Sequence, residues 1–290
     1  MLRWCGAAWL ALACGACSPG GSGNGGSEAA HAARSPAGGA PIALTPDQVH
    51  VRPGSLAASL HPRLHPAAPR ATPEEPREGG TPEHVWMFFN ADSFDAGHPA
   101  RQRQVLVYPA DGWRKLAAAR VPAGAGAAER AAGTPAGDSS PPAPDPAEAL
   151  RRYLDAPGAG PIPILPAPPG GQLFAVQVKR LRFKGGHGVR CVTQYQQALG
   201  PVANERIFYT FQGLTDDGRY MVTVFHPERA KGIPLTALDA FWPRNSAWQS
   251  PRYTAYLDST VRRMQKLKPE DFTPGLKALD HLVESIRIGQ

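Results

Sequence analysis

The pairing of Cys191 with His187, four residues earlier, is the first arrangement in this sequence that could do chemistry. A thiol beside an imidazole is the combination that cysteine nucleophiles use. On a strand, however, residues four apart share one side but are separated by about 13 Å, at roughly 3.3 Å per residue. Cys191 also alternates with Val189 on an apolar face. We therefore interpret Cys191 as a small buried side chain and not as a nucleophile.

The remaining titratable groups lie in turns or are scattered. Asp216 and Asp217 have the residue types of an acid/base pair, but Gly218 follows them directly, so a hairpin turn explains both. The run 185–188 (GGHG) has the composition of a phosphate-binding loop, yet such loops lead from a strand into a helix and this run joins two predicted strands. The nine His residues show no spacing typical of metal ligands. We predict no catalytic residue, no cofactor and no metal site.

One aromatic run is suited to binding. The segment 240–248 (AFWPRNSAW) places two indole rings beside a cation and an amide in a predicted loop. Trp and Arg are enriched at contact surfaces, so Trp242, Arg244, Asn245 and Trp248 form our candidate surface for a sugar or a partner protein. The alternative is that these aromatic rings only cap the edge of a sheet.

The N-terminus has the pattern of a secretory signal. A basic start at Arg3 precedes an apolar run at 4–13 that is too short to span a bilayer. Gly15 and Ala16 then stand directly before Cys17, which resembles the lipobox of bacterial lipoproteins. In that family the thiol carries a diacylglyceryl group, which implies lipidation of Cys17 and export.

Two alternatives to this assignment stay open. Cys14 occupies the place where Leu is usual in the lipobox, and it offers a second lipidation site of its own. An ordinary cleaved signal without lipid is the other alternative. The Gly/Ser-rich segment 18–26 that follows is suited to a flexible tether, which supports an anchor at Cys17.

Composition divides the chain into three parts. We predict a signal peptide at 1–17, a mostly disordered Gly/Ala/Pro-rich tether at 18–80, and a single globular domain at 81–290 with a low-complexity insertion at about 120–144. Within the tether, the segment 42–51 has apolar residues, among them Leu44 and Val49, that we expect to lie on the domain.

The formal net charge of +7 arises entirely after residue 172, where 17 Lys and Arg face 10 Asp and Glu. A basic domain can attract nucleic acid, anionic lipid or acidic polysaccharide. The basic residues are spread over predicted strands and helices and do not form one run, so we interpret them as solvated surface. For an exported protein we expect no nucleic-acid partner.

Alternating apolar residues predict the elements that position these groups. A meander of four strands is expected at 173–183, 189–196, 207–212 and 220–225, with a bulge near Lys179, and two further apolar runs at 85–89 and 105–108 complete the sheet. Helices are expected at 111–119, 145–153, 253–267 and 273–286, with Asp145 as the cap of the second, and residues 286–288 are expected to close the sheet as a short last strand. Arg190 lies on the polar side of the half-buried strand at 189–196, so we expect it to face solvent. Aromatic residues on both sides of the third meander strand indicate a strand that is covered on both faces. The predicted fold class is α+β, an antiparallel meander sheet with C-terminal amphipathic helices packed on it, and its finer form is an α/β/α sandwich.

The central segment 208–220 (FYTFQGLTDDGRY) resembles a motif of an uncharacterised family of bacterial lipoproteins. Segments 80–84, 101–109, 188–195 and 282–286 extend the resemblance over residues 40–290. It implies export and lipidation and carries over no activity, and Cys191 departs from the aromatic or aliphatic residue expected there. The order of meander and helices also looks like the small sandwiches of the PsbP/Mog1 type.

These observations predict a lipid-anchored extracytoplasmic binding or interaction module without enzymatic activity. We expect the N-terminal lipid to hold it on the extracytoplasmic side of a membrane, which is the outer membrane if the cell has one. A further expected partner is an envelope protein or polysaccharide. The alternative is an envelope-associated hydrolase.

Overall fold

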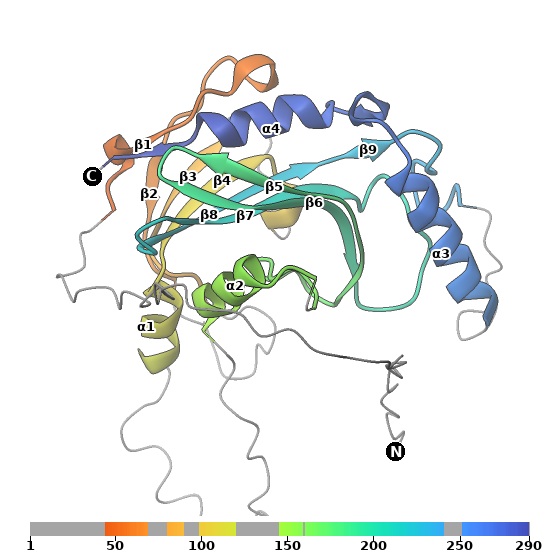
Figure 1. Ribbon diagram of the computed structural model, residues 1–290, viewed down its shortest axis with the longest axis horizontal. Coiled ribbons are helices and arrows are strands. Elements are labelled where there is room, and N and C mark those ends of the chain that lie inside the picture. Colours follow the sequence, from red (N-terminus) through yellow and green to blue (C-terminus); the bar gives the residue numbers. More distant parts are fainter. Residues whose placement is uncertain are drawn as a thin grey trace, which may run out of the picture. The chain divides into compact units, whose positions relative to one another are not determined.

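Seven antiparallel strands form one sheet in the order β2-β3-β4-β8-β7-β6-β5 (Figure 1). The computed structural model describes residues 44–68, 80–89, 99–119, 145–158, 160–240 and 251–289, which belong to the unit Gly38–Gln290. The strands are β2 Arg63–His65, β3 His84–Phe88, β4 Gln104–Pro109, β5 Gly171–Phe183, β6 Gly186–Gln196, β7 Phe208–Thr215 and β8 Tyr220–Pro227. The predicted α+β class with an antiparallel meander is confirmed.

Both faces of the sheet are apolar, because successive side chains on the central strands enter two separate cores. Tyr209 and Phe211 of β7 belong to one core, and Phe208 and Leu214 belong to the other. All eight residues of β7 are buried, which confirms the prediction that this strand is covered on both faces.

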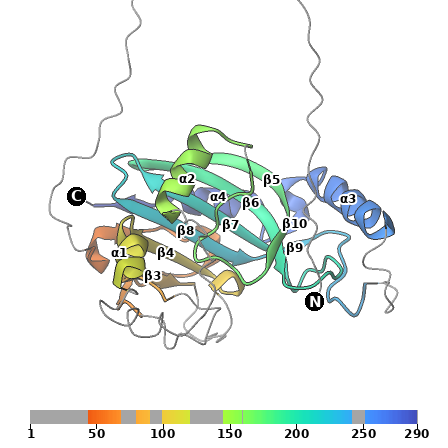
Figure 2. The same cartoon turned by 90° about the horizontal axis from the view of Figure 1, so that it is seen from below.

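Helices lie against each of these faces. The helix α4 (Leu276–Ser285) contributes Leu279 and Val283 to the first core, and α2 (Pro146–Asp155) contributes Leu150 to the second. Seen from below, α2 and α1 (Gly112–Ala119) lie in front of the sheet and α4 lies behind it (Figure 2). As predicted, Asp145 caps α2, since its carboxylate accepts the Ala147 N–H at 3.0 Å.

The helix α3 (Pro251–Gln265) lies at the end of the sheet and not across its face (Figure 1). Its apolar stripe packs on the first core as expected, with Met264 fully buried there, and only its position at the end of the sheet differs from the prediction. The cause lies in the predicted bulge of β5, where Gln177 has a positive φ of 56° and its side-chain amide donates to the carbonyls of Met264, Gln265 and Leu267. One residue of the sheet therefore holds the C-terminal end of α3.

Ordered structure begins earlier than the predicted boundary at residue 81. Leu44 and Val49 are buried in the first core, and β2 pairs with β3. The short strand β1 (Val49–His50) pairs with β11 (Arg287–Ile288) at the other end of the chain. Residues 44–68 therefore form part of the folded unit and not of the tether, and the predicted last strand at 286–288 pairs with β1.

The strand β6 is buried on both faces, whereas the sequence predicted solvent on the side that carries Arg190. Asp280 of α4 is the reason. Its carboxylate meets the Arg190 guanidinium, with Nε to Oδ1 at 3.1 Å, and both side chains are about 5% exposed. Lys179 Nζ lies 2.9 Å from Oδ2, and the Tyr209 hydroxyl donates to Oδ1 at 3.4 Å. Arg190 also donates to the Gln177 carbonyl, so one ion pair joins β6, α4 and the bulge of β5.

Small elements complete the described structure. They are η1 Pro46–Gln48, η2 Gly54–Leu56, η3 Pro99–Arg101, β9 Arg229–Ala230, η6 Pro269–Asp271 and β10 Phe272–Thr273, with β9 and β10 paired to each other. The turn after β7 is as predicted, with Gly218 at a φ of 70° and its N–H donating to the Thr215 carbonyl.

Replacing Asp280 by Asn should lower the free energy of unfolding by about 3 kcal/mol or more, because Arg190 keeps a buried charge without its partner. Urea denaturation measures the change. The matched control Lys179→Met removes a half-exposed partner of the same carboxylate and should cost less than about 1 kcal/mol. Arg190→Met combined with Asp280→Leu should recover most of the loss. Equal costs for Asp280→Asn and Lys179→Met would contradict this role of the buried pair.

Candidate functional site

The residues predicted for lipidation and for contact lie outside the described structure. Cys14 and Cys17 precede it, and Trp242, Arg244, Asn245 and Trp248 fall in the interval 241–250. Their roles stay predictions.

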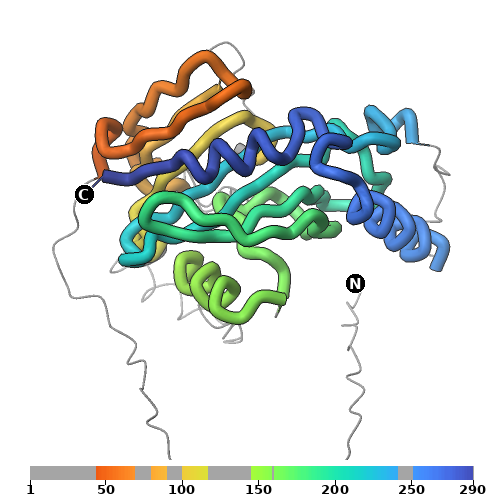
Figure 3. Tube along the Cα trace, turned by 45° about the horizontal axis from the view of Figure 1, so that its top comes forward, coloured from red at the N-terminus to blue at the C-terminus, as the bar shows by residue number. Residues whose placement is uncertain are grey.

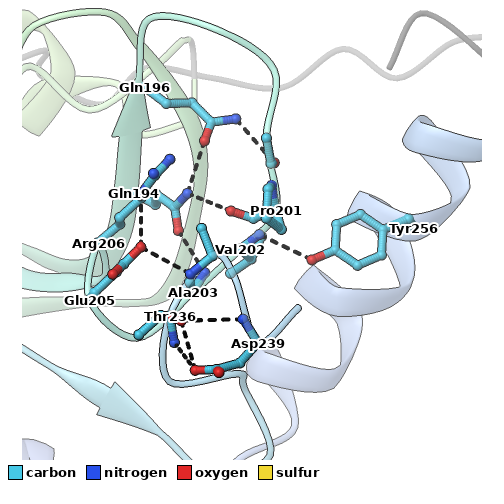
Figure 4. Close-up of polar contacts among 12 residues, drawn as sticks. Gln194, Gln196, Pro201, Val202, Ala203, Glu205, Arg206, Thr236, Asp239 and Tyr256 are labelled. Atoms are coloured by element: carbon cyan, nitrogen blue, oxygen red, sulfur yellow. Dashed lines mark hydrogen bonds and ion pairs between the residues drawn. The ribbon is translucent and has the colours of Figure 1, made fainter. Parts of the chain in front are cut away.

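Two loops and the start of α3 border that interval and are tied together by hydrogen bonds (Figure 4). The Gln194 side chain donates to the Pro201 carbonyl at 3.1 Å and accepts the Ala203 N–H at 3.3 Å. The Tyr256 hydroxyl of α3 accepts the Val202 N–H at 3.0 Å. On the second loop, Glu205 accepts the Ala237 N–H at 2.9 Å. This end of the unit therefore has a defined conformation up to residue 240.

A cavity with a volume of about 580 Å³ lies instead at the N-terminal segment. Ligand sites usually measure about 300–1,000 Å³. Met87 of β3 lines it together with Val49, Val51 and Leu60, so much of its wall is apolar. Figure 3 shows the orange segment running out and back beside α4, above the yellow strands β3 and β4. The segment 46–62 thus forms a loop over the sheet, and the cavity opens between its two arms.

A second cavity of about 400 Å³ lies between the same segment and α4. Arg52 and Ser285 line both cavities, so the two are neighbours. The Ser285 hydroxyl accepts the Arg52 N–H at 2.9 Å and faces the Arg52 carbonyl at 3.1 Å and the Leu282 carbonyl at 2.7 Å. These bonds hold the loop to the end of α4. We call the two cavities together the α4 groove.

The polar lining of the α4 groove includes two guanidinium groups and one carboxylate. Arg52, Arg287 and His50 lie on it, and Asp47 is its one carboxylate. Hydrogen bonding to Thr45 is the main cause that lowers the pKa of Asp47, and nearby His50 lowers it further. His50 and Arg287 are register partners in the β1–β11 pair, so their side chains share one side of that ladder.

Buried ionisable groups are concentrated elsewhere, at the end of β8. The side chains of His226 and Glu228 are 4% and 0% exposed, and His226 Nδ1 lies 3.3 Å from Glu228 Oε1. Burial raises the pKa of Glu228 to about 9, against a smaller opposing effect of Arg103, and burial lowers the pKa of His226 to about 4. Within the described residues neither carboxyl oxygen of Glu228 accepts a hydrogen bond. At neutral pH this pair is uncharged.

A second neutral imidazole, His84, lies inside a column of rings across β2, β3 and β4. Its centroid is 4.9 Å from that of His65 and 4.6 Å from that of Tyr108, and its Nδ1 donates to the Pro82 carbonyl at 2.8 Å. Burial lowers its pKa to about 4. A ring held by stacking and one backbone bond contributes to the packing of these three strands.

The groups considered for catalysis in the sequence have structural roles. Cys191 is fully buried in the second core, and burial raises its pKa to about 12, so the thiolate does not form at neutral pH. His187 bonds to Asp216 at 3.0 Å, and Asp217 accepts from Thr215 and from the Arg219 N–H within the turn. The prediction that Cys191 is a buried small side chain is confirmed.

The described residues contain no group of three His, Cys, Asp or Glu side chains that could hold a metal ion. Over the same residues, no helix has the length and apolarity needed to cross a membrane.

Stability should be greatest near pH 6.5. From pH 6.5 to about 9 the folded state keeps the Glu228 proton that the unfolded chain has lost, so the free energy of unfolding falls as pH rises. From pH 6.5 down to 4.5 the unfolded chain binds protons on both His84 and His226, whereas the folded state holds only the one extra proton on Glu228, so stability falls again. Each slope should be about 1.4 kcal/mol per pH unit.

Urea midpoints measured from pH 5 to 9 test this dependence. Glu228→Gln should remove the alkaline decline and steepen the acid decline to about 2.7 kcal/mol per pH unit, because the two His protons are then no longer offset by the Glu228 proton. The exposed Glu284→Gln is the matched control and should leave the profile unchanged. If the alkaline decline persists in Glu228→Gln, a group other than Glu228 causes it.

Comparison of the chain with protein-family models, curated proteins and solved structures finds no match.

Proposed function

We propose that this protein is a lipid-anchored extracytoplasmic binding module whose ligand site is the α4 groove. The observation that carries the proposal is the groove itself, with apolar walls, two guanidinium groups and a volume of about 580 Å³ in its larger part. A concave, mostly apolar surface with a few polar groups is the usual form of a small-ligand site.

The chemistry of the groove favours binding over hydrolysis. Ser285 is the hydroxyl that both cavities share, and a serine nucleophile needs a base that accepts its proton. The Ser285 hydroxyl faces two backbone carbonyls and the Arg52 N–H. His281 lies one turn earlier on α4, and no hydrogen bond between these two side chains is present among the described residues. The hydroxyl is used to hold the loop.

Anchoring and architecture form the rest of the proposal. The pattern at Cys17 and the Gly/Ser-rich segment 18–26 support a lipid anchor on an exported chain, with Ser18 favouring the outer membrane where one exists. Helices against both faces of the sheet support classing the unit as an α/β/α sandwich.

Cys17→Ser should release the protein from the membrane fraction or leave it unprocessed, because stable anchoring needs two or more acyl chains and this cysteine would carry them. Fractionation and intact-mass measurement give the result. Cys14→Ser is the matched control and should stay anchored. If Cys14→Ser releases the protein and Cys17→Ser does not, the anchor is at Cys14; if neither matters, there is no lipid anchor.

A separate experiment tests the groove by asking whether the protein purified from its own cells carries a bound small molecule. Mass spectrometry of the mild-detergent-purified protein should find a bound small molecule. Leu60→Trp, which fills the groove, should lose that molecule while folding normally. A molecule that is retained by Leu60→Trp would place the ligand elsewhere.

A further inference from the structure

The apolar walls and the charged side chains of the α4 groove together indicate which class of ligand it suits. Val49, Val51, Leu60 and Met87 line its larger cavity, and all four belong to the first core or pack against it. Apolar side chains at this surface are suited to an alkyl chain, whose burial removes apolar area from water. A fully polar ligand, such as an unsubstituted sugar, would leave these walls without a matching surface.

The two guanidinium groups of the groove lie at its larger cavity without a salt bridge to any described residue. Among the described residues, neither the Arg52 nor the Arg287 guanidinium forms an ion pair or a side-chain hydrogen bond, although both line the larger cavity. The carboxylate of Asp47 also lines it and is paired with neither arginine. A guanidinium presents a planar set of donors that matches a carboxylate or a phosphate in a bidentate manner.

The positions of both arginines are fixed by the backbone. The Arg52 N–H and carbonyl both meet the Ser285 hydroxyl, at 2.9 and 3.1 Å. Arg287 is held in the β1–β11 pair opposite His50. Because the backbone of each arginine is held in place, less conformational entropy is lost when its side chain binds an anion.

We propose that the α4 groove binds an amphipathic anion, an alkyl chain that ends in a carboxylate or phosphate, with Arg52 and Arg287 at the anionic end. This inference rests on the proposed function and adds the class of ligand. The same chemistry is found in a free fatty acid and in an anionic lipid, and the experiment below separates the two sources.

Calorimetric titration of the mature chain with decanoate, decyl phosphate, 1-decanol and acetate tests the class. Decanoate and decyl phosphate should bind, 1-decanol should bind about tenfold more weakly or worse, and acetate should not bind measurably. Arg52→Gln and Arg287→Gln should each lower decanoate affinity by about tenfold and leave 1-decanol unchanged. Arg263→Gln on the exposed side of α3 makes the same change of charge outside the groove and should have no effect.

The outcomes separate the ligand class from the groove. If 1-decanol binds as tightly as decanoate, or if Arg263→Gln weakens binding as much as Arg52→Gln, the anionic class is wrong. If Leu60→Gln in that case weakens the binding of both decanoate and 1-decanol, the groove remains the ligand site and the proposed function stands. If Leu60→Gln changes the affinity for neither ligand, the groove is not the site and both proposals fail. Both also fail if no probe binds and the purified protein carries no molecule that Leu60→Trp loses.

Vesicles identify the source of the anion. Competition for bound decanoate by phosphatidylglycerol vesicles, but not by phosphatidylcholine vesicles, supports an anionic lipid as the ligand. Failure of both vesicles to compete, with decanoate binding intact, supports a free amphiphile. Equal competition by the two vesicles would contradict recognition of the anion.

Discussion

The buried ion pair between Arg190 and Asp280 is the constraint on which the arrangement of this unit depends. Taking two charges out of water is costly, and the cost is met only when their geometry and the surrounding hydrogen bonds are complete. Here Lys179, Tyr209 and the Gln177 carbonyl complete them. The pair therefore determines where α4 must lie on the sheet, because any shift of that helix leaves a buried charge without its partner.

The position of α4 in turn determines the candidate site. Its last residue, Ser285, holds the backbone of Arg52, and the strand that follows it pairs with β1. The segment 46–62 is thereby kept above β3 as a loop, and the α4 groove is the space under and beside that loop. The same ion pair reaches α3 through the bulge at Gln177. A stabilising interaction on one face thus positions the proposed ligand site, which is lined by residues near both ends of the folded unit.

Local patterns predicted most of the sheet and the caps. They did not reveal features that depend on contacts between residues far apart in the sequence. Alternation indicated β7 as covered on both faces, and Asp145 with Pro146 indicated the start of α2. Arg190 was placed toward solvent, because a charged residue in an alternating strand gives no sign of an acid that lies 90 residues later. The groove was missed for the same reason, since Arg52 and Ser285 are 233 residues apart and neither has a local signal. The expectation that Leu44 and Val49 lie on the domain is confirmed, whereas composition alone placed residues 52–68 in the tether although β2 pairs there with β3.

We conclude that α4 holds the N-terminal segment in place and so forms the groove. Hydrogen–deuterium exchange at the amides of Arg52 and His50 tests it most directly. We predict that both amides are protected in the native protein, together with those of α4, and that Ser285→Ala selectively speeds exchange at Arg52 while α4 stays protected. Exchange of both amides at the rate of an unfolded chain in the native protein would contradict the account.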